Sequence, residues 1–161
     1  MDAPQSPASV RLGYLMTAAA LGRVLPDLIR PLAEASGVAR RRAVIAVVGV
    51  ALARPGLSDA RLHDAFAELC NGQTGGEARD EIIALAEQFD VIAFDLQHRL
   101  EQGEDVGAEF YAAFARARAA AALAAALEPD SLQSAYGVLH EAAYALENPG
   151  VVRDIVLRAL R

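Results

Sequence analysis

The run Ala43–Ala53 constrains this chain more than any other feature of its sequence. It reads AVIAVVGVALA, and three arginines, Arg40, Arg41 and Arg42, come directly before it. None of its side chains is charged or able to form a hydrogen bond. Because so much apolar surface is unfavourable in water, other segments must cover it. The run is too short for a membrane span, which needs ~20 residues. We expect a buried segment at the centre of the fold.

This run is compatible with a strand or a helix, since five of its residues are β-branched. Two observations favour a helix. The run is long for a buried strand, and no other segment is strand-like enough to pair with it. An unpaired strand would leave its backbone N–H and C=O groups without partners. We therefore predict a central helix over residues 38–53 that ends before Pro55 and Gly56.

Helical periodicity continues on both sides of the run, and alanine, the strongest helix former, supplies 36 of the 161 residues. The longest predicted helix covers about residues 75–102. These patterns predict an all-α fold: a single-domain bundle of seven to eight helices, residues 9–161, packed around the buried central helix. Residues 1–8 are interpreted as a flexible leader. An alanine tract at 119–126 predicts close contact with either the central helix or the same helix of a second subunit.

Prolines, glycines and short polar residues predict the helix ends. Pro26 and Asn148 are expected to start the second and the last helix, and Pro31 to kink or split the second. Gly37 is expected to end the second helix. Side-chain caps are predicted at Ser9, Ser58, Thr74 with Glu77, Asp105, and Asp130 with Gln133.

The net charge of −6 argues against nucleic-acid binding, which relies on a basic surface. The charge is uneven: residues 1–56 carry seven arginines and three acids, and residues 57–161 carry eight arginines and eighteen acids. Such asymmetry indicates either a charged partner or two halves whose charges match when they pack. No segment has the pattern of a signal peptide or a membrane span, so we expect a soluble, cytoplasmic protein.

The richest candidate site lies on the predicted seventh helix, which runs to about residue 147. Gln133, Tyr136, His140, Tyr144 and Glu147 recur at spacings of three and four, so they form one stripe. Histidine titrates near neutral pH, which suits His140 for acid–base catalysis between Tyr136 and Tyr144. The alternative is an amphipathic edge, where tyrosines bury their rings and keep their hydroxyls in water.

Asp95 and His98 form a carboxylate–histidine pair, three residues apart, on the long helix. Dinuclear metal sites in helical bundles need one such pair on each of two helices. The other histidines, His63 and His140, are far away in sequence, so we predict no metal and no cofactor. Asp95 and His98 remain candidate ligand-binding residues. The single cysteine, Cys70, has no partner for an internal disulfide and is interpreted as a small buried residue.

Arg40, Arg41 and Arg42 place three positive charges at the start of the central helix, where they oppose the helix dipole. Three kinds of group would compensate: the carbonyl end of the preceding helix, a carboxylate from the acidic half of the chain, or a bound anion such as phosphate. In the third case the three arginines would form a ligand-binding clamp.

Two hypotheses of function follow. The first is a helical interaction or regulatory protein that works as a homodimer, because no catalytic motif is present and apolar helix surface is in surplus. The second is a small metal-independent enzyme, or a protein that binds a small anionic ligand, with a pocket between helices. Convergence of His140, His98 and an arginine on one cavity would favour the second hypothesis.

Overall fold

The computed structural model describes residues 18–54 and 56–161, and these residues form helices joined by short loops. A helical stretch at residues 18–24 leads into seven further helices. They are α2 (Pro26–Glu34), α3 (Gly37–Leu52), α4 (Ala60–Cys70), α5 (Gly76–Glu101), α6 (Gly107–Ala126), α7 (Leu132–Ala145) and α8 (Pro149–Ala159). No strand occurs in either described range. The all-α prediction is confirmed, and the central run forms α3. The predictions for residues 1–8 and for Ser9 lie outside the described residues.

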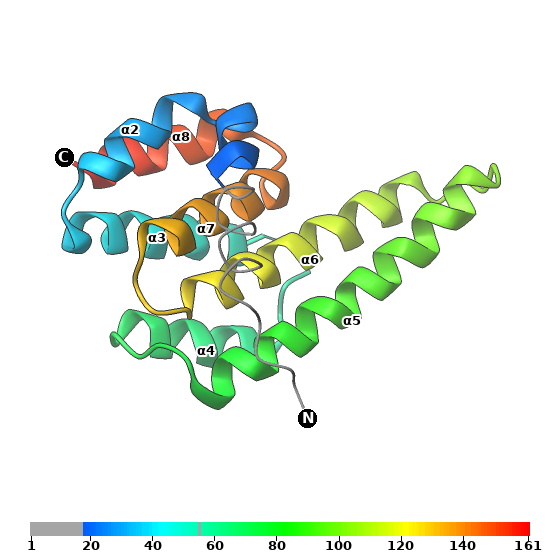
Figure 1. The fold of residues 1–161 in the computed structure, drawn as a ribbon. Coiled ribbons are helices and arrows are strands. Elements are labelled where there is room, and N and C mark those ends of the chain that lie inside the picture. Colours follow the sequence, from blue (N-terminus) through cyan, green and yellow to red (C-terminus); the bar gives the residue numbers. More distant parts are fainter. Residues whose placement is uncertain (1–17, 55) are drawn as a thin grey trace, which may run out of the picture.

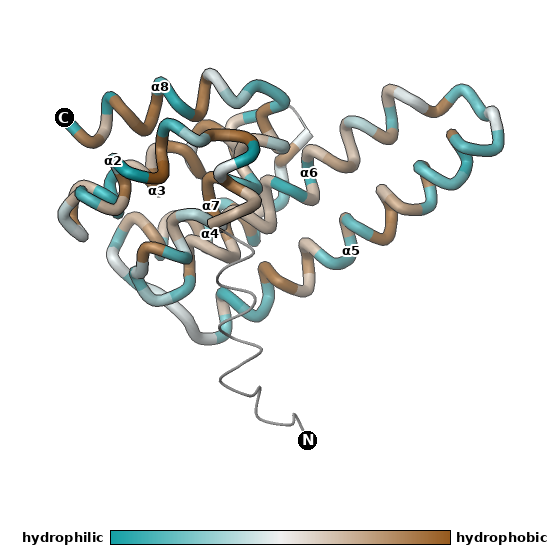
Figure 2. Tube along the Cα trace, turned by 45° about the horizontal axis from the view of Figure 1, so that its top comes forward, coloured by the Kyte–Doolittle hydropathy of each residue, from teal (hydrophilic) through white to brown (hydrophobic). Residues whose placement is uncertain are grey.

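The helices form a body and an arm (Figure 1). In the body, α3 contacts α4, α6, α7 and α8, and α2 lies along α8. Helices α5 and α6 run antiparallel, and their far halves project beyond the other helices. We call residues 87–109, which include the loop between α5 and α6, the arm. Figure 2 shows hydrophobic stretches where the body helices meet and mostly hydrophilic residues at the end of the arm.

The burial of α3 follows from this position. Ala43, Val47 and Ala51 recur every four residues and are completely buried. Val38 and Val50, in contrast, are 79% and 40% exposed. The expectation that α3 is covered on every side is therefore wrong in part, because its neighbours surround only part of its circumference. One of those neighbours, α4, contributes the Phe66 ring, which packs directly on the α3 backbone at Gly49.

The alanine-rich helix α6 lies between α5 and α7 and makes its most extensive contacts with those two helices. Within the predicted tract, Ala119, Ala120 and Ala122 are completely buried inside a single chain. Small side chains let neighbouring helices approach closely, so the tract allows α6 to pack against two long partners at once. It also reaches α3, as predicted. The alternative contact, with the same helix of a second subunit, stays a prediction.

Some predicted helix ends are wrong by one or two residues. Ser36 caps α3 by accepting a hydrogen bond from the Ala39 amide, so Gly37 begins α3 instead of ending α2. Asp59 rather than Ser58 caps α4. Where two polar residues are adjacent, the direction of the incoming chain decides which of them caps, and the sequence does not contain that direction.

The remaining predicted caps give a mixed result. Helices α5 and α6 begin without a side-chain cap, so the predictions for Thr74, Glu77 and Asp105 are wrong. The capping box of α7 is Ser131 with Ser134, in place of Asp130 with Gln133. Pro26 and Asn148 start α2 and α8 as predicted, and Pro31 lies inside α2, which continues through it. Within the described residues, no helix combines the length and the apolar character needed to cross a bilayer.

Candidate functional site

The three arginines at the start of α3 bind the carbonyl ends of other helices. The first of them, Arg40, donates from Nη1 to the carbonyl oxygens of Leu32 (3.3 Å) and Ala35 (3.2 Å) at the end of α2. The last carbonyls of a helix lack partners within the helix and carry its partial negative charge. Arg40 therefore satisfies the end of α2, which is the first of the three compensating groups that the sequence allowed.

The next two arginines serve other helices in the same way. Arg41 donates from Nη1 to the carbonyl of Ala126, the last residue of α6, at 2.8 Å. Arg42 donates from Nε to the carbonyl of Ala159, the last residue of α8, also at 2.8 Å. Each guanidinium places a positive charge at the negative end of a helix, which is favourable.

A fourth arginine completes the pattern at the opposite end of α3. Arg54 donates from Nη1 to the carbonyl of Ala145, the last residue of α7, and lies 3.4 Å from a carboxylate oxygen of Glu147. Three arginines at the start of α3 and Arg54, two residues past its last residue, therefore each satisfy the C-terminal end of a different helix: α2, α6, α8 and α7. We call these four residues the arginine collar. Its geometry gives the collar a structural role that needs no bound anion.

The stripe predicted on α7 splits into two environments. Tyr136 is buried, and its hydroxyl donates to the carbonyl of Ile29 in α2 at 3.1 Å. Tyr144 instead meets the Phe114 ring of α6, and the His140 ring lies edge to face against Tyr144, with centroids 5.2 Å apart. Tyr136 thus joins α7 to α2, whereas His140 and Tyr144 belong to a separate aromatic cluster.

That cluster includes three rings from the start of α6. Phe110 lies beside Tyr111 and Phe114, with centroid separations of 5.2 and 6.0 Å. Phe114 meets Tyr144 edge to face at 6.2 Å, which links the two helices. Such edge-to-face and offset pairs are favourable beyond the area that they bury. The aromatic side chains of α6 and α7 therefore form one connected surface.

A cavity of about 460 Å³ opens beside these rings. Besides the aromatic residues Phe110, Tyr111, Phe114 and Tyr144, its lining comprises Val24, Ala143, Glu147 and Pro149. We call it the aromatic pocket. Its volume lies within the range of small-ligand sites, roughly 300–1,000 Å³. The sequence analysis placed Tyr144 and Glu147 on one stripe but did not foresee the contribution of α6. The available signal was the group of three aromatic residues at 110–114.

An ion triad lies next to the aromatic pocket. Arg118 of α6 binds Asp90 of α5 at 2.5 Å and Glu141 of α7 at 2.8 Å, and it also lies 5.5 Å from the centre of the Phe114 ring. Burial lowers the pKa of Arg118, but the charge of Glu141 and the hydrogen bond to Asp90 outweigh it and raise the pKa above its usual value. The triad joins three helices at the point where the arm leaves the body.

The other predicted site residues do not meet His140 in a common cavity. Asp95 and His98 are exposed on the arm, and the His98 ring lies 2.9 Å from the side-chain amide of Gln102. None of the three cavities described in this section and the next is lined by a histidine. Across residues 18–54 and 56–161, no three His, Cys, Asp or Glu side chains are placed to hold a metal ion together. Cys70 is exposed at the end of α4, which corrects the expectation of a buried thiol.

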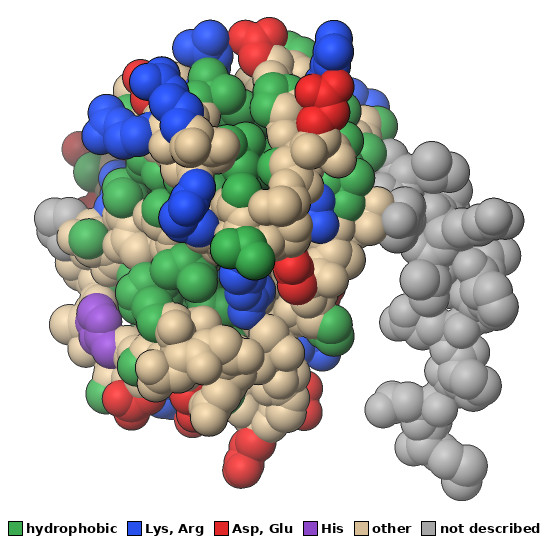
Figure 3. Space-filling model, turned by 90° about the vertical axis from the view of Figure 1, so that its left-hand side faces the viewer, with side chains coloured by type: hydrophobic (Ala, Val, Ile, Leu, Met, Phe, Trp, Pro, Cys, Tyr) green, Lys and Arg blue, Asp and Glu red, His purple; other side chains and the backbone are tan. Residues whose placement is uncertain are grey.

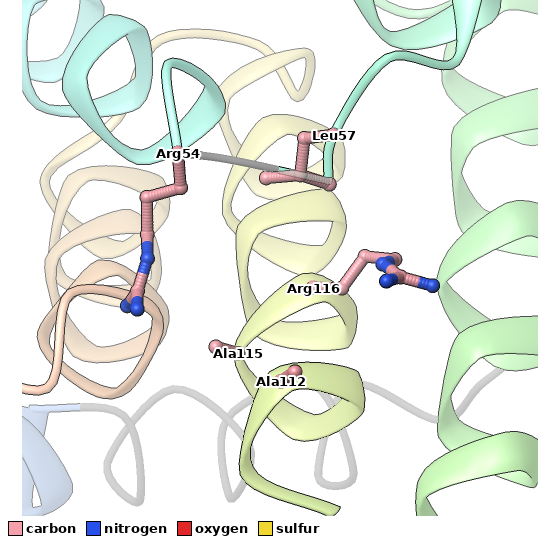
Figure 4. Close-up of a pocket in the computed structure, with 5 residues that line it drawn as sticks. All are labelled: Arg54, Leu57, Ala112, Ala115 and Arg116. Atoms are coloured by element: carbon pink, nitrogen blue, oxygen red, sulfur yellow. The ribbon is translucent and has the colours of Figure 1, made fainter. Parts of the chain in front are cut away.

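One further cavity brings two arginines near each other without forming a clamp. It has a volume of about 160 Å³ and is lined by Arg54, Leu57, Ala112, Ala115 and Arg116. Figure 4 shows the two guanidinium groups pointing in different directions, Arg54 toward the end of α7 and Arg116 toward α5. Arg116 lies 5.7 Å from the centre of the Phe89 ring. The two groups are therefore not arranged to hold one small anion between them.

Comparison with known proteins adds no assignment: the chain matches no protein-family model, no curated protein and no solved structure.

Proposed function

We propose that this chain is a soluble, cytoplasmic helical interaction protein that forms a homodimer through its arm. The observation that carries the proposal is an apolar patch on the arm. Val91 and Phe94 lie three residues apart on one face of α5 and are 69% and 68% exposed. Ile92, which is 47% exposed, lies on another side of the helix. Exposed large apolar side chains that lie together mark surfaces that contact a partner. We call Val91 and Phe94 the arm patch.

The charges around the arm patch limit what binds it. Residues 87–109 carry seven acids and one arginine. Only two of these acids, Asp90 and Glu104, form an ion pair within the described chain. A partner surface that is both apolar and basic would therefore complement the arm.

The body of the same chain offers such a surface. A shallow hollow of about 480 Å³ at the start of α3 is lined by Gly37, Val38, Arg41, Arg42, Ile45 and Asp130. Residues 18–54 carry six arginines and two acids. Figure 3 shows arginine side chains and hydrophobic side chains interspersed on the face opposite the arm. We call this surface the α3 hollow.

Two copies placed side by side in antiparallel orientation would make this contact twice. The acidic arm of each chain would lie on the basic α3 hollow of the other, related by a two-fold axis. Symmetric dimers of this kind are the commonest assemblies of soluble proteins. Opposite charges at the contact would also make the association weaker at high salt.

Sedimentation equilibrium on two single variants tests the dimer. Phe94→Asp adds a charge to the arm patch, and Val38→Asp adds an acid to the α3 hollow. Both residues are exposed, and an acid near the N-terminus of α3 is favourable for the helix. We expect each variant alone to be monomeric. Their equimolar mixture should form a heterodimer, because one intact arm and one intact hollow remain.

Val151→Asp is the matched control, since Val151 is an exposed valine in the first turn of α8 and lies outside both surfaces. This variant should dimerise like the wild type. A wild-type chain that stays monomeric at all accessible concentrations would refute the proposal. A mixture that stays monomeric would refute the contact between arm and hollow.

A second candidate function is the binding of a small molecule, and the aromatic pocket is the specific observation that favours it. The residues of this pocket differ from the histidine–tyrosine stripe and arginine clamp that the sequence predicted. His140 contacts the Tyr144 ring but does not line the pocket, and the arginines of the collar bind helix ends. Only Tyr144 of the predicted catalytic residues lines the pocket, so we propose binding without acid–base catalysis.

A further inference from the structure

Aromatic rings and a carboxylate line the aromatic pocket. Four of its lining residues are aromatic, and three of these come from a single turn of α6. The faces of aromatic rings are electron-rich and attract cations. Phe114 already shows this behaviour within the chain, since the Arg118 guanidinium lies 5.5 Å from its ring centre.

The charge that the described lining residues carry has one sign. Among them, Glu147 is the only acidic or basic residue. Its partner Arg54 is 3.4 Å away, lines the neighbouring cavity instead, and donates its other nitrogen to the end of α7. The Glu147 side chain stays half exposed, so its carboxylate remains available to a ligand. This carboxylate would repel an anionic ligand, and the faces of aromatic rings attract cations rather than anions.

The backbone of Glu147 provides an independent observation. It is the one described non-glycine residue with a positive φ, at 55°. It follows the C-cap Leu146 of α7, a position where glycine is the usual residue because it adopts this conformation without strain. Strained residues of this kind often lie at binding sites. A glycine here would relieve the strain but would remove the only charge that the described residues bring to the pocket.

We propose that the aromatic pocket binds a small organic cation, an amine or quaternary ammonium ion that carries an apolar group. The charge would lie against the Glu147 carboxylate and the tyrosine rings, and the apolar group would fill the space lined by Val24, Ala143 and Pro149. This inference rests on the second candidate function and names its ligand class. It is independent of the dimer, because the arm patch contributes no residue to the pocket.

Calorimetric titration of the full chain with three compounds of similar size tests the proposal. Benzyltrimethylammonium is the cationic probe, benzyl alcohol the neutral control, and benzoate the anionic control. Cation–π and carboxylate contacts of this kind are worth about tenfold in affinity. We expect the cation to bind at least roughly tenfold more tightly than either control.

Variants then locate the site. Glu147→Gln and Tyr144→Leu should each weaken binding of the cation about five- to tenfold, because each removes one attractive group. Glu101→Gln, an exposed carboxylate on the arm, should leave the affinity unchanged. The same titration in the Phe94→Asp variant should give the wild-type affinity, so a failure of the dimer proposal does not affect this result.

Equal binding of all three compounds would overturn the proposal, since it would mark a plain apolar groove. The same holds if the cation binds but neither Glu147→Gln nor Tyr144→Leu weakens it. If no compound binds and NMR signals of the pocket aromatics shift with protein concentration, a second copy of the chain occupies the pocket, and the proposal is also wrong.

Discussion

Replacing Arg41 by methionine tests the structural role of the arginine collar most directly. Methionine keeps much of the aliphatic packing of the arginine side chain but removes the donor to the Ala126 carbonyl. Ala126 is 1% exposed, so water does not readily replace the lost partner. Losing a hydrogen bond from a charged donor costs about 1.5–3 kcal/mol.

Part of this cost is offset. Removing a cation from the start of α3 relieves an unfavourable interaction with the helix dipole, worth about 0.3–1 kcal/mol. The Nη2 atom of Arg41 is buried and has no hydrogen-bond partner in the described chain, so its removal also costs nothing. We expect Arg41→Met to lower the free energy of unfolding by about 1–2 kcal/mol. For a chain of this length the midpoint of thermal unfolding falls by about 2–8 °C.

Urea unfolding followed by far-UV circular dichroism measures the difference. Arg42→Met is the internal comparison, because its hydrogen bond to Ala159 is exposed and water can replace it. It should cost less than half as much as Arg41→Met. The measurement is repeated in chloride and in phosphate at equal ionic strength. A collar that only caps helix ends gives the same loss in both salts, whereas a collar that binds an anion gives a wild type that phosphate stabilises selectively.

Two results would refute the capping role. The first is an Arg41→Met variant within about 0.3 kcal/mol of the wild type in chloride, which is below the cost of any partly buried charged hydrogen bond. The second is a phosphate-specific stabilisation of the wild type that Arg41→Met abolishes. That outcome would restore the ligand-binding role proposed for Arg40, Arg41 and Arg42.

Three further predictions concern stability. Arg118→Met should destabilise the chain by about 2 kcal/mol in urea unfolding, because it leaves Asp90 and Glu141 without their shared partner; Arg99→Met, which breaks an exposed pair, should cost under about 0.5 kcal/mol. Glu147→Gly should raise the free energy of unfolding by about 0.5–1 kcal/mol because glycine adopts the positive φ without strain, whereas Glu147→Ala should not raise it. A Gly variant that is no more stable than the wild type would show that the backbone of Glu147 is not strained. The hydrogen bond from Arg61 holds the pKa of Asp59 below its usual value, so the carboxylate stabilises the fold above pH ~4 and this contribution is lost as the pH falls through the folded pKa. Asp59→Ala should therefore cost about 1 kcal/mol at neutral pH and progressively less in acid, and a loss that is constant with pH would argue for a cap that does not depend on charge.

Several features of the fold followed from local sequence alone. The run at 43–53 had to be buried, and the lack of a second strand-like segment made it a helix, which α3 confirms. The long helix was also predictable, with ends at Gly76 and Glu101 close to the expected 75–102. These properties depend on periodicity, on helix propensity and on the positions of glycine and proline, all of which act between residues near each other in sequence.

The candidate sites depended on contacts that local sequence does not contain. The Arg41 side chain reaches a carbonyl 85 residues away, and that of Arg42 reaches one 117 residues away. Three arginines in a row are compatible with a clamp, a salt-bridge cluster or three helix caps, and only the directions of α2, α6 and α8 select the caps. The carbonyl end of the preceding helix was foreseen for Arg40, but the other two helix ends were not.

The arrangement of the aromatic rings also depends on contacts between residues far apart in sequence. The spacing on α7 placed Tyr136, His140 and Tyr144 on one stripe, yet Tyr136 turns into the core toward α2 while Tyr144 meets Phe114 of α6 and carries His140 beside it. A helical stripe is wide enough to touch two different neighbours, so periodicity alone does not tell which residues share a pocket. The sequence by itself determined that the chain is helical and which run lies at its centre. The tertiary structure decided which helix ends the arginines satisfy and which rings meet, because both depend on how distant helices pack.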